Sequence, residues 1–136
     1  MFITKNKISF HDCDPAGILF FSKVYEICHS AYEDLIRTFN LKEDYWNNMH
    51  YVVPILKSEA HYHKPLKHGE EISIQILVKT LKSSSFELQY EILNAKKEVC
   101  VVAYTVHVFV DKITWGKKAM NNDIIDCFKK YRENKS

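Results

Sequence analysis

The stretch HDCDPAGILFFSKVYEICHSAYEDLI, residues 11–36, combines two closely spaced aspartates, a Pro-Ala-Gly turn and a long apolar pattern. From Ile18 to Phe39 the apolar residues recur at intervals of three and four, which predicts a helix with a wide apolar face. Such a face has to be buried against other elements, so the fold depends on which elements the rest of the chain supplies to cover it.

Downstream of this helix the hydrophobic period changes to two. Residues 71–78 and 86–93 alternate between apolar and polar side chains and predict strands with one buried face. Residues 99–110 are apolar throughout and predict a central strand covered on both faces. The other predicted elements are strands at 2–10 and 57–66, a loop with a short helix at 40–54, and a short final helix at 121–131.

The order of these elements is one strand, a long helix, four consecutive strands and a terminal helix. Consecutive strands joined by short turns form an antiparallel sheet, and the helix covers its apolar face. This order favours an α+β hotdog fold, in which a five-stranded antiparallel sheet wraps a long central helix and a short C-terminal helix follows. The length suits a single domain over residues 1–136.

Composition narrows the function classes. A net charge of +2 without clustered basic residues argues against nucleic acid as a partner. No apolar run approaches membrane-spanning length and no signal peptide is recognisable, so we expect a cytoplasmic protein without membrane insertion and with reduced cysteines. His61 and His63 share one face of a strand, but no pattern adds a third ligand, so we expect no metal.

Asp12 and Asp14 allow two interpretations. An aspartate just before a helix can cap its free N–H groups, and this explains one acid but not two. Gly17 permits a close backbone approach, and a nearby helix N-terminus offers N–H donors for a developing negative charge. A carboxylate facing such donors would form an acyl-transfer site.

Residues 12–33 closely resemble the D-x-D-x-x-G signature and following helix of the 4-hydroxybenzoyl-CoA thioesterase family of hotdog proteins, and KPLKHGEEI, residues 64–72, looks like a second segment of that family. The resemblance implies hydrolysis of an acyl-CoA by a homo-oligomer, a dimer that usually pairs into a tetramer. It implies no cofactor, since coenzyme A is part of the substrate. It assigns Asp14 as the nucleophile or general base, and the Phe21 N–H, beyond the Gly17 turn, as the donor to the thioester carbonyl.

A subgroup resemblance is carried by the same segment. Short-chain acyl-CoA thioesterases associated with the Tol–Pal system usually have Tyr and His where this chain has Phe10 and Phe21. The pattern F-x-D-x-D, Phe21, Lys23-Val24, Ile27-Cys28-His29 and Ala31-Tyr32-Glu33 instead resembles 1,4-dihydroxy-2-naphthoyl-CoA thioesterases. This likeness implies an aromatic acyl-CoA substrate from menaquinone or phylloquinone biosynthesis.

Several residues are candidates for binding the substrate. A slot for a flat acyl group would be lined by four aromatic residues, Phe20, Phe21, Tyr25 and Tyr32, although Phe20 and Tyr32 fit the core better. His29 is either a helper in the acyl pocket or a structural hydrogen-bonding group. Lys82, Ser83 and Ser84, and more weakly Lys64, are candidates for the coenzyme A phosphates; otherwise residues 79–85 are a polar hairpin turn.

Two alternatives stay open from the sequence. The same site would also serve short aliphatic acyl-CoA or acyl carrier protein substrates, and a hotdog domain can bind acyl-CoA without catalysis. Independently of the resemblance, a five-stranded sheet with open edges favours pairing of two copies around a two-fold axis.

Overall fold

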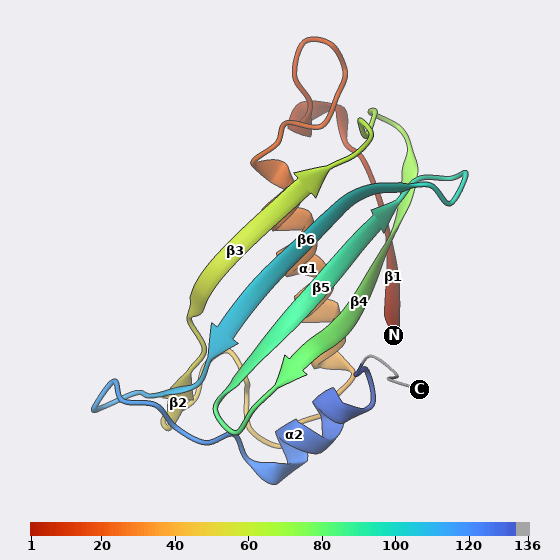
Figure 1. Ribbon diagram of the computed structural model, residues 1–136. Coiled ribbons are helices and arrows are strands. Elements are labelled where there is room, and N and C mark those ends of the chain that lie inside the picture. The colour runs from red at the N-terminus through yellow and green to blue at the C-terminus, as the bar shows by residue number, and fades with distance from the viewer. Residues whose placement is uncertain (133–136) are drawn as a thin grey trace.

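The computed structural model describes residues 1–132 and has the predicted α+β hotdog architecture (Figure 1). Within these residues, neither helix is both long and apolar enough to cross a membrane. The elements are β1 (Phe2–Lys7), a 3₁₀ turn η1 (Phe10–Asp12), α1 (Lys23–Arg37), β2 (Tyr51–Val52), β3 (Ile55–Tyr62), β4 (Glu71–Leu81), β5 (Ser85–Leu93), β6 (Val99–Val108), β7 (Val110–Asp111) and α2 (Asn122–Lys129).

Five antiparallel strands form the main sheet in the order β1-β4-β5-β6-β3, and α1 packs along its concave face (Figure 1). The alternation predicted for β4 and β5 is confirmed, because every second residue is buried against the helix. The buried helix side chains meet these strand residues in one core, and Tyr32 and Leu35 of α1 are fully buried in it.

The central helix begins at Lys23, five residues later than the apolar pattern predicts. Residues 17–19 pair with the segment after β3 instead. The Leu19 N–H donates to the Leu66 carbonyl at 2.7 Å, and the His68 N–H donates to the Gly17 carbonyl at 3.0 Å. Leu19 is still buried, so burial made these residues look helical although their backbone bonds are sheet-like.

Two other predictions were wrong in detail. β6 is an internal strand, between β5 and β3, but it is not covered on both faces, because its outward side chains, Val102, Tyr104 and Val106, are only half-buried. Residues 40–54 contain no helix; the Asn48 side chain accepts the N–H groups of His50 and Tyr51 at 2.9 Å each and directs the chain into β2, which pairs with β7.

The two edges of the sheet differ. At the β1 edge, the Thr4 hydroxyl donates to Asp34 of α1 at 2.9 Å and ties the helix to the strand. At the β3 edge, Ile55, Leu56 and Tyr62 are 45%, 66% and 50% exposed. Cavities lie between α1 and β3 on this side. The helix is therefore tied to the sheet at β1, whereas cavities separate it from β3.

Candidate active site

Asp14 organises the loop that leads to α1. One carboxylate oxygen, Oδ1, accepts the N–H groups of Ala16 at 2.9 Å and Ile18 at 3.2 Å. Its backbone N–H and carbonyl bond to Ile18 and Gly17, so the turn is closed from both sides. Oδ2 has no hydrogen-bond partner among residues 1–132. The loop thus fixes the half-buried carboxylate and leaves one oxygen available.

Gly17 is required by the turn. Its φ of +78° is in the left-handed region, which side-chain-bearing residues adopt at a cost. A Cβ there would also lie 3.1 Å from Nδ1 of His68. Gly17 therefore lets this loop and the loop after β3 pack together.

Neither aspartate caps α1. The N-cap residue is Ser22, which makes no side-chain capping bond, and Asp14 bonds within its own loop. The carbonyl of Asp12 accepts the Phe20 N–H at 2.9 Å and so holds the chain just before the helix. The side chain of Asp12 lies 3.4 Å from Nε2 of His11 and 3.9 Å from Nζ of Lys23, the first residue of α1, so it contacts the helix start through a charge rather than through a capping bond.

The helix start carries free backbone donors. The N–H groups of Phe21 and Ser22 donate to no acceptor within residues 1–132, whereas Lys23 and Val24 bond back to Phe20 and Phe21 at 2.9 and 3.3 Å. Free N–H groups at a helix start bind anionic oxygen, and the helix dipole adds to this.

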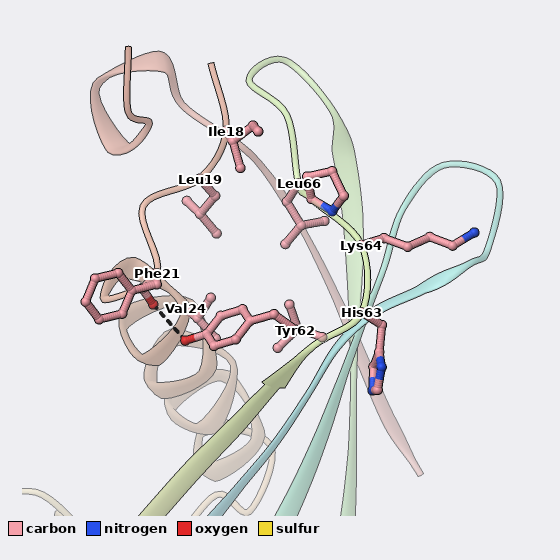
Figure 2. A pocket seen from close by; sticks show the side chains of 10 residues that line it. Ile18, Leu19, Phe21, Val24, Tyr62, His63, Lys64 and Leu66 are labelled. Carbon is pink, nitrogen blue, oxygen red and sulfur yellow. Dashed lines mark hydrogen bonds between the residues drawn. The ribbon is translucent and has the colours of Figure 1, made fainter. Parts of the chain in front are cut away.

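A cavity of about 240 Å³ opens beside these donors (Figure 2). Ile18, Leu19 and Leu66 lie on one side of it, and Phe21, Val24 and Tyr62 lie on the other. The lining is predominantly apolar, as expected for an acyl group. Asp14 is not among its lining residues; its loop continues directly into them through Ile18.

Tyr62 is a site residue that the sequence did not single out. Its hydroxyl donates to the Phe21 carbonyl at 3.2 Å and joins the end of β3 to the start of α1 (Figure 2). Partial loss of water contact, and more weakly Tyr25 and Cys28, raise the pKa of this phenol, which stays a donor. Only the fold brings residues 21 and 62 together.

Phe20 and Lys64 do not point into this cavity. Phe20 is 46% exposed and packs on Phe21, with ring centroids 5.0 Å apart, so the expectation that it belongs to the core was wrong. Lys64 lines the cavity with its backbone and stem, while its ammonium group turns away to pair with Glu98 (Figure 2). Hydrogen bonds from Lys64 and Asn94 lower the pKa of Glu98.

Tyr25 and His29 lie further along the same side of α1. Both line a second cavity between α1 and β3. Nδ1 of His29 is 3.0 Å from a carboxylate oxygen of Glu33, and the His29 ring packs on Tyr32. The two residues are therefore placed together, on the side of α1 that faces β3.

Lys82, Ser83 and Ser84 are at the opposite end of the sheet. They form the hairpin between β4 and β5, beside α2, whereas the Asp14 loop lies at the other end (Figure 1). The carbonyls of Ser83 and Ser84 accept the N–H groups of Met120 and Phe109 at 2.8 Å each. Within one chain, this hairpin and Asp14 therefore lie too far apart to form one site.

Cys13, between the two aspartates, is not a suitable nucleophile. Burial, followed by the negative charges of Asp14 and Asp12, raises the pKa of its thiol. A raised pKa keeps the thiol protonated, whereas the thiolate is the reactive form. Within residues 1–132 no group of three His, Cys, Asp or Glu side chains is placed to hold a metal ion.

Comparison with known proteins gives a consistent result. The model of the thioesterase-like superfamily matches residues 8–126. A 1,4-dihydroxy-2-naphthoyl-CoA hydrolase from Gloeothece citriformis is 32% identical over 118 residues, covering 84% of this chain and 82% of that protein. A hydrolase of the same name from Nostoc punctiforme is 30% identical over 128 residues, covering 92% and 85%. The crystal structure of a 1,4-dihydroxy-2-naphthoyl-CoA thioesterase from Synechocystis, 20% identical, superimposes with a TM-score of 0.87 over 94% of this chain and 95% of that one.

Proposed function

Since the chain belongs to the thioesterase-like superfamily and is an acyl-CoA thioester hydrolase, we propose that its substrate is an aromatic acyl-CoA, 1,4-dihydroxy-2-naphthoyl-CoA. The relatives that share this chemistry by name cover most of the chain, and the matched superfamily region, residues 8–126, contains Asp14. The observation that supports the site is the pair of free N–H groups at Phe21 and Ser22 beside an apolar cavity.

In the proposed mechanism, Asp14 supplies or activates the attacking oxygen. Its Oδ2 either attacks the thioester carbonyl directly or takes a proton from a water molecule that attacks. The carbonyl oxygen gains negative charge and accepts the Phe21 N–H. The C–S bond then breaks, and the coenzyme A sulfur leaves as a thiolate that takes up a proton. In the direct route, water afterwards hydrolyses the mixed anhydride on Asp14.

We propose further that the active form is at least a homodimer paired along β3. That edge exposes Ile55, Leu56 and Tyr62, and both cavities lie beside it. An antiparallel two-fold pairing would put the β4–β5 hairpin of the partner at the same end as the Asp14 loop. Lys82, Ser83 and Ser84 would then bind the coenzyme A phosphates across the interface. The cytoplasmic location expected from the sequence is part of this proposal.

The test is thiol release from a panel of CoA thioesters. The panel contains 1,4-dihydroxy-2-naphthoyl-, 4-hydroxybenzoyl-, benzoyl-, acetyl- and palmitoyl-CoA, assayed with wild type, Asp14→Asn and the surface control Asp126→Asn. We expect the naphthoyl thioester to be preferred and Asp14→Asn to reduce kcat at least about 100-fold, because the oxygen delivery is lost. Asp126→Asn should match wild type.

Other outcomes would change the proposed substrate, mechanism or activity. Preference for acetyl-CoA would replace the aromatic substrate with a short aliphatic one. Turnover that survives in Asp14→Asn would remove the mechanism. Tight binding of the panel without any turnover would make the domain a non-catalytic acyl-CoA binder.

A further inference from the structure

The second cavity reaches the polar interior of the sheet. It has a volume of about 350 Å³ and lies between α1 and β3. Tyr25, Cys28 and His29 form its helix side, and Ser58 lies on β3. Glu26 and Ile55 also line it, and so do Tyr90 of β5 and Thr105 of β6, although the last two are only 1% and 5% exposed. The cavity therefore ends at two buried hydroxyl groups.

These hydroxyls belong to a buried chain of hydrogen bonds. The Tyr90 hydroxyl is 2.8 Å from Oγ1 of Thr105, which is 2.7 Å from Nε2 of His107. His107 is fully buried, with its ring stacked on Phe86 at 4.6 Å. Its second nitrogen, Nδ1, has no partner among the described residues. The chain thus has one closed end, at His107, and one end at the cavity.

The unpartnered nitrogen sets the direction of the bond between His107 and Thr105. Burial, and more weakly His29, lower the pKa of His107 to about 3, so the ring is neutral and carries one proton. A proton on Nδ1 would leave a buried N–H without an acceptor, which is rarer than a bare acceptor nitrogen. The proton is therefore on Nε2, which donates to Thr105. Thr105 and Tyr90 share one hydrogen bond in which either oxygen can donate, so one of their two hydroxyl hydrogens is left without an acceptor within residues 1–132. When Thr105 donates, that hydrogen belongs to Tyr90 and is free for a ligand in the cavity.

We infer that the Tyr90 hydroxyl is a specificity-determining group, which donates a hydrogen bond to a ring oxygen of a hydroxylated aromatic acyl group. This inference rests on the proposed function, because it places the thioester carbonyl at the Phe21 N–H, beside the first cavity, and the ring of the acyl group in the second cavity. Tyr25 is in the first turn of α1, four residues after Phe21, a separation of about 6 Å at the helical rise per residue. A flat acyl group whose carbonyl meets the Phe21 N–H therefore extends toward Tyr25 and Cys28, and its ring oxygen toward Tyr90.

The Tyr90 hydroxyl would discriminate between acyl groups with and without a ring oxygen, because only the former gives it an acceptor. An acyl group without the ring oxygen would fill the cavity but bury the Tyr90 hydroxyl with no acceptor. Sites built to bind a substrate hydroxyl reject the analogue that lacks it more strongly than they reject a change in size. The substrate class is thus an aryl thioester with a ring oxygen remote from the thioester.

The test measures kcat/KM for three substrates: 1,4-dihydroxy-2-naphthoyl-CoA, 1-hydroxy-2-naphthoyl-CoA and 2-naphthoyl-CoA. Wild type should prefer the dihydroxylated substrate by roughly 10-fold or more. Tyr90→Phe removes one oxygen atom and keeps the ring, and it should abolish this preference by lowering kcat/KM for the dihydroxylated substrate alone. Tyr104→Phe, on the outward face of β6, is the matched control and should keep the preference. A second measurement, binding of the free naphthoic acids to wild type, does not depend on how any variant folds.

The outcomes separate this inference from the proposed function. If wild type hydrolyses all three naphthoyl thioesters and Tyr90→Phe keeps the wild-type preference, the role of Tyr90 is overturned and the thioesterase stands. The same holds if wild type shows no preference among the three substrates. It also holds if Tyr90→Phe lowers kcat/KM equally for all three, as expected if an ordered water accepts the Tyr90 hydrogen bond. If wild type hydrolyses acetyl-CoA but no naphthoyl thioester, both proposals fail together.

Discussion

His107 shows how one buried residue links stability to pH. Its ring is enclosed by Phe86 and Tyr32, with centroids 4.6 and 4.7 Å away, and Thr105 bonds one nitrogen. A buried imidazole is easily accommodated when neutral and poorly when charged, because the cation loses its hydration. His107 therefore lowers the free energy of unfolding only at acidic pH, where the imidazole would be protonated.

We predict that acid destabilises the protein through His107. The pKa is about 3 in the folded chain and 6.5 ordinarily, so below about pH 6.5 the unfolded state takes up the proton first. From about pH 7.5 to pH 4.5 the free energy of unfolding should fall by about 2–3 kcal/mol from this group. Urea denaturation at both pH values measures this fall. In His107→Gln, which does not titrate, the fall should shrink by that amount; an equal fall in both proteins would contradict the prediction.

At the same scale, Gly17→Ala should cost about 1–2 kcal/mol of stability and most of the activity, because φ is +78° and the new methyl group meets His68. Gly69→Ala separates the two effects, since its φ is +80° but nothing lies within 4 Å. It should lose similar stability and keep its activity. Thermal melts and thiol-release assays on both variants check this. Equal activity losses would show that backbone strain, rather than the contact at residue 17, is responsible.

Between elements, the key contact joins the end of β3 to the start of α1. The Tyr62 hydroxyl holds the Phe21 carbonyl, one peptide unit away from the N–H that we propose as the oxyanion donor. Because that donor must be placed accurately, a small shift of the helix start weakens transition-state binding more than ground-state binding.

Tyr62→Phe should therefore lower kcat several-fold, with KM and melting temperature nearly unchanged. The ring still fills the cavity wall, and only one hydrogen bond is lost. Steady-state kinetics with the preferred acyl-CoA provide the measurement, with Tyr104→Phe as the control. A rise in KM at constant kcat would indicate a substrate contact instead of a positioning role.

Local sequence patterns predicted some elements and not others. β4 and β5 were predictable because one face is buried and the other faces solvent, which gives the hydrophobic pattern a period of two. The start of α1 was not, because residues 18–19 are apolar for tertiary reasons. The backbone of residues 17–19 bonds to Leu66 and His68 instead of forming a helical turn. Among site residues, Asp14, Gly17 and Phe21 share one local motif that a sequence displays. Tyr62 and Tyr90 have no such motif, since only the folded sheet places them beside α1.

For the whole molecule, the open β3 edge predicts a dimer. Sedimentation should give at least twice the chain mass of 16.1 kDa. Leu56→Asp places a charge on the exposed β3 edge, and it should weaken the assembly and the activity together. Ile3→Asp places the same charge on the other edge strand, where Ile3 is 52% exposed, and should leave the dimer intact. Dissociation by Ile3→Asp alone would move the interface to β1.

The separation of Asp14 from the β4–β5 hairpin has a genetic consequence. If each reaction centre takes its acid from one polypeptide and its phosphate contacts from the other, two defective alleles can rescue each other. A subunit with Asp14→Asn and one with Lys82→Glu would each be impaired alone. In a mixed assembly, one centre collects both defects and the other receives none. Co-expression of the two alleles should then restore activity that neither supports by itself.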